Sequence, residues 1–587
     1  MTIQKTFISN HFFSILILLL VTTSSTFSQI KVEEIDQLLV KYKELQQFNG
    51  SALVAHQGKV ILKKGYGMAN MEWDIPNTPE TKHRLGSVTK QFTAMLILQL
   101  AAEGKIDLEA PILTYLPDYP QDKAEIITTH NLLTHSSGIP NYTAFPDFFE
   151  KKSQTYQSPD DFIKEFQDMA LDFEPGERFS YSNSGYFLLG VILEKVSGKT
   201  YDALLEEKIL QPLNMKDTGY DLHSTILKKR ATGYKKRGFD YVNSRYLDMS
   251  LPYAAGAMYS TIEDLYKWDQ ALYTNKLLPQ DFMDMYFKKH INVGNEDAYA
   301  YGWMVGEQNI GNTTESTKVI GHGGGINGFN TLIKRYPEQK TLVVLLNNTG
   351  GAPLNSIAQS ILGIVYDKSY DIPKASIAQE MRNIISDDDF NSALVFFKEN
   401  EDSNNYDFNE DEMNALGYEL MGENQYKQAS VIFQLNVDRF PNSSNVYDSY
   451  AESLMQLGNT QQAISIYKKS LELNRNNQNA IEMLKKLDVD TSEYEKEIIV
   501  PEEILKSYVG TYELQPGFNL EIFKNGNQMQ VQATGQGIVD IFPKSQTRFY
   551  LKIIQAEIEF NKAEDGNIKS LTLFQAGQEM EGKRLEE

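Results

Sequence analysis

The spacing of apolar residues along the chain predicts helices and strands in a definite order. Residues 32–45 are apolar at every third or fourth position, which predicts an amphipathic helix. Residues 50–67 contain strand-like alternation, and a second helix is predicted from Ser87 to Glu103. The apolar run Leu342–Leu346 indicates a buried strand. Strands at both ends with helices between them predict one α/β domain over residues 29–368.

A repeating pattern of apolar and small residues follows a predicted linker at residues 370–373. Two copies of a unit of about 34 residues are in register. Their matching positions are Leu416, Gly417, Leu420, Ala429, Phe433 and Pro441, and then Tyr450, Ala451, Leu454, Ala463 and Tyr467. The pattern resembles the tetratricopeptide repeat and predicts α-helical repeats over residues 375–490. An unrelated helical hairpin is the alternative.

Short apolar alternations separated by turn residues occupy residues 500–587. They predict a small antiparallel β-barrel or sandwich. The run Tyr508–Tyr512 resembles the start of the small lipocalin-like domain that is often appended to serine hydrolases.

The N-terminal residues predict export. Lys5 precedes a short apolar run, which small polar residues follow, and this is the pattern of a signal peptide over residues 1–28. A membrane anchor is the alternative, but the run is shorter than the roughly 20 apolar residues of a spanning helix. We therefore expect a periplasmic or secreted protein without stable membrane insertion once the signal is removed.

Composition excludes several classes of function. The formal net charge is −22, which argues against nucleic acid as a partner because such binding needs clustered Lys and Arg. The chain has no cysteine, which excludes disulfides, thiol catalysis and cysteine-ligated zinc. The eight histidines are scattered and form no H-E-x-x-H motif, so neither a catalytic metal nor another cofactor is expected.

The first motif with candidate chemistry is Ser87-Val88-Thr89-Lys90. Residues three apart on a helix share a face, so Lys90 can reach the Ser87 Oγ. At the start of a helix this Oγ also lies near exposed backbone N–H groups and the positive end of the dipole. A lysine that burial holds neutral can then act as a general base. The alternative is a capping serine beside a solvated lysine.

Two later motifs add candidate groups. In Tyr181-Ser182-Asn183, a tyrosine hydroxyl near an ammonium is easier to deprotonate and can relay a proton. Asn183 can hold a substrate carbonyl and the lysine together. In the run His322–Gly325, glycines on a strand edge admit a substrate backbone and leave an N–H for an oxyanion. A polar loop and a flexible glycine loop are the respective alternatives.

Together these motifs resemble the penicillin-binding-protein and class C β-lactamase superfamily, in which S-x-x-K is followed by Y-x-N and then by K-T-G or H-x-G. The resemblance covers about residues 45 to 365. It implies an antiparallel sheet flanked by helices, with a helical subdomain. It also implies that Ser87 is the acylated nucleophile, Lys90 its base, Tyr181 the proton relay and Asn183 a contact for substrate and Lys90.

The resemblance further assigns the glycine-rich motif to substrate and oxyanion binding. His322 takes the place of the basic residue of the triplet, Gly323 and Gly324 complete the triplet, and the backbone N–H groups of Ser87 and Gly325 become the oxyanion donors. His135 is expected to be structural, within a turn.

The triplet also departs from K-T-G. A lysine is charged near neutral pH, whereas a histidine titrates there, so His322 makes binding of a substrate carboxylate weaker and pH-dependent. The H-x-G variants of the superfamily include esterases, D-amino-acid peptidases and amidases. We therefore expect an exported serine hydrolase that forms an acyl-enzyme on a D-amino-acid-containing peptide or a small ester. The alternatives are a β-lactamase and a non-catalytic scaffold that binds a protein partner through its repeats.

Overall fold

The computed structural model describes residues 30–145, 148–294, 296–492, 494, 500–525, 528–551, 556–563, 567–575 and 578–585. The chain divides into two compact units, residues 1–419 and 420–587. The predicted signal peptide at residues 1–28 lies outside the described residues. No helix in the described part of the chain is long and apolar enough to cross a membrane.

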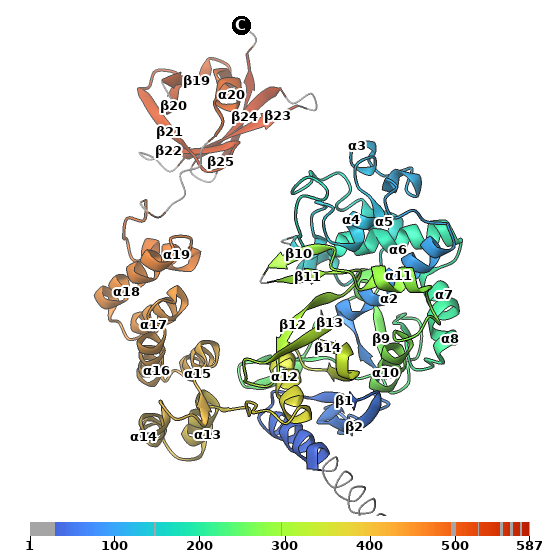
Figure 1. The fold of residues 1–587 in the computed structure, drawn as a ribbon. Coiled ribbons are helices and arrows are strands. Elements are labelled where there is room, and N and C mark those ends of the chain that lie inside the picture. Colours follow the sequence, from blue (N-terminus) through green and yellow to red (C-terminus); the bar gives the residue numbers. More distant parts are fainter. Residues whose placement is uncertain are drawn as a thin grey trace, which may run out of the picture. The chain divides into compact units, whose positions relative to one another are not determined.

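An antiparallel sheet of eight strands forms the centre of the first unit (Figure 1). Its spatial order is β10 (Ile291–Gly294), β11 (Asp297–Tyr299), β12 (Met304–Asn309), β13 (Ser316–Ile326), β14 (Phe329–Tyr336), β15 (Thr341–Asn347), β1 (Gly50–His56) and β2 (Lys59–Tyr66). β1 pairs with β15, which joins strands from the two ends of the unit. Every residue of β15 is buried, as the apolar run in the sequence predicts.

Alternate residues of β15 face two different cores because successive side chains of a strand point to opposite faces. Val343 and Leu345 pack with the helix over residues 30–44 and with α12 (Leu354–Val365). Val344 and Leu346 pack on the other side with α2 and α10. α2 (Thr89–Ala102) is buried from Thr89 to Leu100, so it has no exposed face over that length. This central helix carries the candidate base.

A helical subdomain covers the α2 side of the sheet. It consists of α3 (Gln121–Ala124), α4 (Thr129–Leu133), α5 (Pro159–Ile163), α6 (Asn183–Ser197), α7 (Tyr201–Leu205), α8 (Gln211–Leu213), α9 (Tyr253–Gly256), α10 (Ile262–Ala271) and α11 (Gln280–Tyr286). Three short strands precede α2: β3 (Met68–Asn70), β4 (Ile75–Pro76) and β5 (His83–Arg84). Four more lie between α8 and α10: β6 (Gly219–Tyr220), β7 (Tyr234–Arg237), β8 (Asp240–Asn243) and β9 (Met258–Ser260). α6 begins at Asn183, which places that residue in the first helical turn, whereas Tyr181 and Ser182 precede the helix.

Helices follow at α13 (Ile377–Asp387), α14 (Phe390–Asn400), α15 (Glu410–Gly422), α16 (Tyr426–Arg439), α17 (Ser444–Gln456), α18 (Thr460–Leu473) and α19 (Gln478–Lys486). A short parallel pair, β16 (Ala375–Ser376) and β17 (Tyr406–Asp407), lies among them. α17 and α18 begin 34 residues after α15 and α16 respectively. The helical segment is therefore confirmed, and its tetratricopeptide assignment stays a prediction.

The C-terminal strands close into a barrel after a short helix, α20 (Glu502–Tyr508). The strands are β18 (Gly510–Gln515), β19 (Phe518–Asn525), β20 (Gln528–Ala533), β21 (Ile538–Pro543), β22 (Arg548–Leu551), β23 (Ala556–Lys562), β24 (Ile568–Gln575) and β25 (Gln578–Arg584). All their pairings are antiparallel, so the predicted small antiparallel β-barrel is confirmed. Tyr512 and Phe549 lie in its packed core.

Candidate active site

Ser87 lies in a tight turn that brings it against the edge of the sheet. The 3-10 turn Gly86–Val88 directly precedes α2. Gly86 has a φ of 54°, a conformation that favours glycine, and a Cβ at this position would lie 2.9 Å from the Gly325 nitrogen. Thr331 Oγ1 donates a hydrogen bond of 2.7 Å to the Leu85 carbonyl. These contacts hold the partly exposed Ser87 side chain beside strand β13.

Lys90 connects Ser87 to two other elements. Its Nζ lies 3.1 Å from the Ser87 Oγ, as the shared helical face predicts. The same Nζ donates hydrogen bonds of 2.8 Å to Asn183 Oδ1 and 2.8 Å to the Ala255 carbonyl. Lys90 is completely buried, and no salt bridge in the described part of the chain involves it.

Burial lowers the pKa of Lys90 well below its ordinary value. A neutral amine has two N–H groups and one lone pair. The oxygens of Asn183 and Ala255 can only accept, so they take the two N–H groups. The lone pair is then directed at Ser87, whose hydroxyl becomes the donor. The two carbonyl groups therefore orient Lys90 as a base toward one hydroxyl.

Tyr181 lies beside this pair. Its ring centroid is 4.8 Å from the Lys90 Nζ and 4.2 Å from the ring of His135. Burial raises the pKa of the Tyr181 hydroxyl, and the nearby Ser87 side chain offsets part of this rise, although no well-formed hydrogen bond reaches the hydroxyl from the described residues. This corrects the expectation of an easily deprotonated tyrosine. The resting side chain is a neutral phenol, which suits a proton donor or relay.

His135 supports the second motif, as the sequence analysis expects of a structural residue. It has a φ of 57°, and its Nδ1 accepts a hydrogen bond of 3.1 Å from the Ser182 N–H. Asn141 fixes the orientation of Asn183. The Asn141 Oδ1 accepts a hydrogen bond of 3.1 Å from the backbone N–H of Asn183 and one of 3.3 Å from the side-chain amide of Asn183. The Asn183 oxygen is thereby left facing Lys90.

The glycines of β13 allow the strand to approach the Ser87 turn. A Cβ at Gly324 would lie 1.9 Å from the Leu85 carbonyl oxygen, closer than any real contact. A Cβ at Gly325 would meet nothing within 4 Å, because that position opens into the neighbouring cavity. Gly323 lies between them and His322 on the same strand. The backbone at Gly325 is thus placed next to Ser87.

His322 is a neutral side chain. Burial lowers its pKa to about 4. Its Nδ1 lies 2.6 Å from the Gly323 carbonyl and donates to it, so its Nε2 accepts from the Tyr299 hydroxyl at 3.0 Å. This corrects the expectation of a histidine that titrates near neutral pH and offers a pH-dependent cation to a substrate carboxylate.

A cavity of about 450 Å³ opens at Ser87. Its other lining residues are Gly86, Tyr142, Thr143, Phe148, Phe149, Asn183, Leu247, Pro252, Ala255, Gly256, Gly325, Ile326, Asn327, Phe329, Asn330, Gly350 and Gly351. Aromatic and apolar side chains form much of the wall, and none of these residues carries a charged side chain. The cavity therefore suits a ligand whose groups near the nucleophile are neutral.

The structure brings together all the residues that the motifs single out, although they come from three separate regions: α2 with the turn before it, the start of α6 with the residues before it, and β13. Sequence reasoning missed the Ala255 carbonyl, the Tyr299 hydroxyl and the Asn141 amide. A backbone carbonyl has no signature in residue type. Tyr299 and Asn141 belong to residue types that are common in this chain and stand outside the three motifs, so only their tertiary contacts identify them.

Comparison with known proteins gives the family. The family model described as Beta-lactamase matches residues 35–363, which is more than half of the chain. The chain belongs to the Beta-lactamase family. A second model, a domain of unknown function named DUF3471, matches residues 495–586 and so includes the C-terminal barrel of this Beta-lactamase family member.

Relatives of this Beta-lactamase family member include a Bacillus subtilis protein described as penicillin-binding protein PbpX, 31% identical over 56% of this chain and 77% of its own. Penicillin-binding protein 4* of the same organism is 24% identical over 95% of this chain and 99% of its own. The solved D-amino acid amidase of Ochrobactrum anthropi is 27% identical, has a TM-score of 0.50, and is matched over 57% of this chain and 97% of its own. The chain is a serine hydrolase of the acyl-transfer type.

Proposed function

We propose that the chain is an exported hydrolase that cleaves an amide bond in a D-amino-acid-containing peptide or amide, or a small ester bond. The proposed export depends on the N-terminal signal pattern. The observation that carries the proposal is the contact between Ser87 and the buried Lys90, which forms no salt bridge among the described residues. The Lys90 Nζ lies 3.1 Å from the Ser87 Oγ.

In the proposed first step, the Ser87 Oγ attacks the substrate carbonyl while its proton passes to the Lys90 lone pair. The new C–O bond converts the carbonyl oxygen into an oxyanion, which the backbone N–H groups of Ser87 and Gly325 stabilise. Asn183 contacts both Lys90 and the substrate. These roles use only groups that already lie within one connected site.

In the proposed second step, the bond from the carbonyl carbon to the leaving nitrogen or oxygen breaks. Tyr181 donates its phenolic proton to the leaving group, and the Lys90 ammonium returns a proton to Tyr181, so both residues regain their resting states. A water molecule then attacks the acyl-enzyme by the same route in reverse. The raised pKa of Tyr181 keeps its phenol protonated in the resting site, so this proton is present when the leaving group departs.

The uncharged cavity supports a substrate without a carboxylate near the reacting bond. A carboxylate transferred into this cavity would lose water without gaining a cationic partner, and such burial is costly. The neutral His322 adds no charge. The similarity to the D-amino acid amidase supports an amide of a D-amino acid, such as one with an aromatic side chain against Tyr142 and Phe148.

A labelling experiment tests the nucleophile. Wild-type protein, Ser87→Ala and the control Ser316→Ala are treated with a fluorescent phosphonate. Ser316 lies at the exposed outer end of β13. We expect labelling of wild type and Ser316→Ala only. Equal labelling of Ser87→Ala would refute the assignment of Ser87.

A substrate panel tests the proposed class: D-phenylalanine amide, its L-enantiomer, p-nitrophenyl acetate, a D-Ala-D-Ala peptide and nitrocefin. We expect higher kcat/KM for the amide and the ester, which have no carboxylate, than for the carboxylate-bearing peptide and nitrocefin. His322→Lys should shift this ratio toward the carboxylates by placing a cation in the site. If nitrocefin is the best substrate of wild type, the β-lactamase alternative replaces this proposal.

A further inference from the structure

A second cavity of about 980 Å³ lies in the first unit and shares no lining residue with the cavity at Ser87. Its walls come from the end of α2 and the segment after it, from α4, from α11 and the segment that follows it, and from the loop after β11. The lining residues are Ala101, Gly104, Ile106, Asp107, Leu108, Glu109, His130, Asp281, Phe282, Asp284, Met285, Lys288, His290 and Tyr301. The catalytic mechanism uses none of them.

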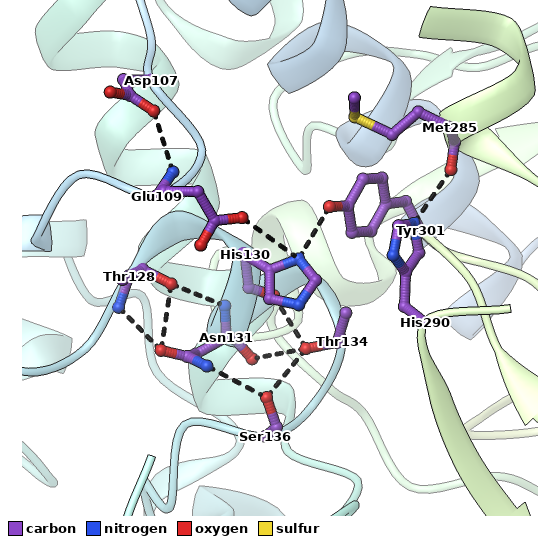
Figure 2. A network of polar contacts seen from close by, with 10 residues as sticks. All are labelled: Asp107, Glu109, Thr128, His130, Asn131, Thr134, Ser136, Met285, His290 and Tyr301. Atoms are coloured by element: carbon purple, nitrogen blue, oxygen red, sulfur yellow. Dashed lines mark hydrogen bonds and ion pairs between the residues drawn. The ribbon is translucent and has the colours of Figure 1, made fainter. Parts of the chain in front are cut away.

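Figure 2 shows the polar network at one wall of this cavity. His130 Nδ1 lies 2.7 Å from the Tyr301 hydroxyl, and the ring of His290 stacks on Tyr301 with centroids 4.0 Å apart. His290 Nε2 donates to the Met285 carbonyl at 2.9 Å. The His290 Nδ1 is then the nitrogen with a lone pair, and no partner for it is found among the described residues. Burial lowers the pKa of His290 to about 4, so this nitrogen stays an acceptor at neutral pH.

Contacts within the protein hold the residues of this wall in place without a ligand. Gly302, directly after Tyr301, has a φ of 78°, and a Cβ there would lie 2.7 Å from the Lys90 carbonyl, so this segment is packed closely against α2. Reciprocal hydrogen bonds between Thr128 and Asn131 cap the helix that carries His130, as Figure 2 shows. A preformed wall reduces the ordering cost of binding.

The lining combines an apolar floor with an exposed rim on which negatively charged side chains predominate. Ile106 and Leu108 are buried, and Phe282 and Met285 are partly buried. Four exposed carboxylates stand at the rim against the single ammonium of Lys288: Asp107, Glu109, Asp281 and Asp284. An apolar body that carries a positive charge therefore matches the floor and the rim together.

We propose that this second cavity binds a small organic cation, a primary ammonium on an aromatic or alkyl body. The body packs on Phe282 and Met285. The ammonium lies toward Asp281 and Asp284 and donates a hydrogen bond to the His290 Nδ1. This assignment is independent of the function proposed for Ser87.

Calorimetric titration of the full chain tests the site, and the variants described in the next paragraph separate binding here from binding at the catalytic cavity. The probes are 2-phenylethylammonium, the neutral 2-phenylethanol and the anionic 3-phenylpropanoate. We expect the ammonium to bind with a Kd of about 1 mM or tighter. The alcohol should bind more weakly, and the anion about tenfold more weakly or not at all. Equal affinity for the cation and the anion, or no binding of the cation, would overturn the proposal.

Variants assign the binding to this cavity. The double variant Asp281→Asn/Asp284→Asn should weaken binding of the ammonium about three- to tenfold, the range for two exposed charge contacts. Asp118→Asn/Asp160→Asn makes the same change in net charge at a separate exposed cavity and should bind like wild type. Hydrolytic activity of each variant verifies folding, because these residues lie outside the catalytic machinery. An equal loss in both double variants, or in neither, would refute the site.

Discussion

The substitution Lys90→Met removes the amine at Ser87 and keeps a side chain of similar length. The Lys90 Nζ contacts the Ser87 Oγ at 3.1 Å and is fixed by two carbonyl groups at 2.8 Å each. Loss of one general base lowers a rate by about 10²- to 10⁴-fold. We therefore expect the burst of p-nitrophenol released from p-nitrophenyl acetate to slow by that factor. A variant whose burst stays within tenfold of wild type would refute the role of Lys90 as base.

The same variant tests whether Lys90 is held neutral. An unfolded lysine has a pKa of about 10.4. Burial lowers the pKa in the folded protein, so between the two values the unfolded chain binds a proton that the folded chain has released. The free energy of unfolding of the wild type then rises with pH, by at most about 1.4 kcal/mol per pH unit. Methionine does not titrate, so Lys90→Met lacks this dependence.

Lys90→Met also leaves Asn183 Oδ1 and the Ala255 carbonyl without their donor, at about 1–3 kcal/mol for each buried acceptor. That cost does not depend on pH. Calorimetry at pH 6 and pH 9 therefore separates the two effects: the wild type should gain stability relative to Lys90→Met between pH 6 and pH 9. The control Lys105→Met, at an exposed lysine, should show no such trend. The same stability difference at both pH values would mean that the buried amine stays charged.

Two further predictions concern β13. Gly324→Ala places a Cβ 1.9 Å from the Leu85 carbonyl oxygen, so we expect calorimetry to show a loss of about 1–3 kcal/mol in stability and ester hydrolysis a loss of about 100-fold in kcat. Gly325→Ala, which has open space at its Cβ, should keep wild-type stability. Equal stability of the two variants would contradict the packing argument. An unfolded histidine binds a proton from about pH 6.5 downward, whereas folded His322 does so only near pH 4. The wild type should therefore lose stability as the pH falls across this interval, and His322→Gln should lose less. Identical calorimetric pH profiles of the two proteins would refute the neutral histidine.

The parts of the site that local sequence determines could be predicted. The three-residue spacing of Ser87 and Lys90 on a helix gave their contact, and the apolar run Leu342–Leu346 gave a central strand. In each case neighbouring residues supply the physical cause, so one sequence window is enough.

The charge states could not be predicted, because burial is a property of the folded chain. Nothing in the sequence around His322 indicates that it is buried and accepts a hydrogen bond from Tyr299. The same holds for the Ala255 carbonyl, which approaches Lys90 from a segment far along the chain. The sequence therefore predicted the candidate reacting groups, whereas their protonation required the tertiary structure.

Those charge states have a common consequence. Burial disfavours the charged form of Lys90, Tyr181, His135 and His322 alike. The resting site is therefore neutral, and in the mechanism that we propose the first charges to appear are the Lys90 ammonium and the oxyanion, which form together when Ser87 attacks. In a buried site of low dielectric constant these opposite charges attract each other more strongly than in water. A fixed cation beside Lys90 would oppose formation of the ammonium, so the neutral His322 favours the proton transfer that a charged residue at that position would hinder.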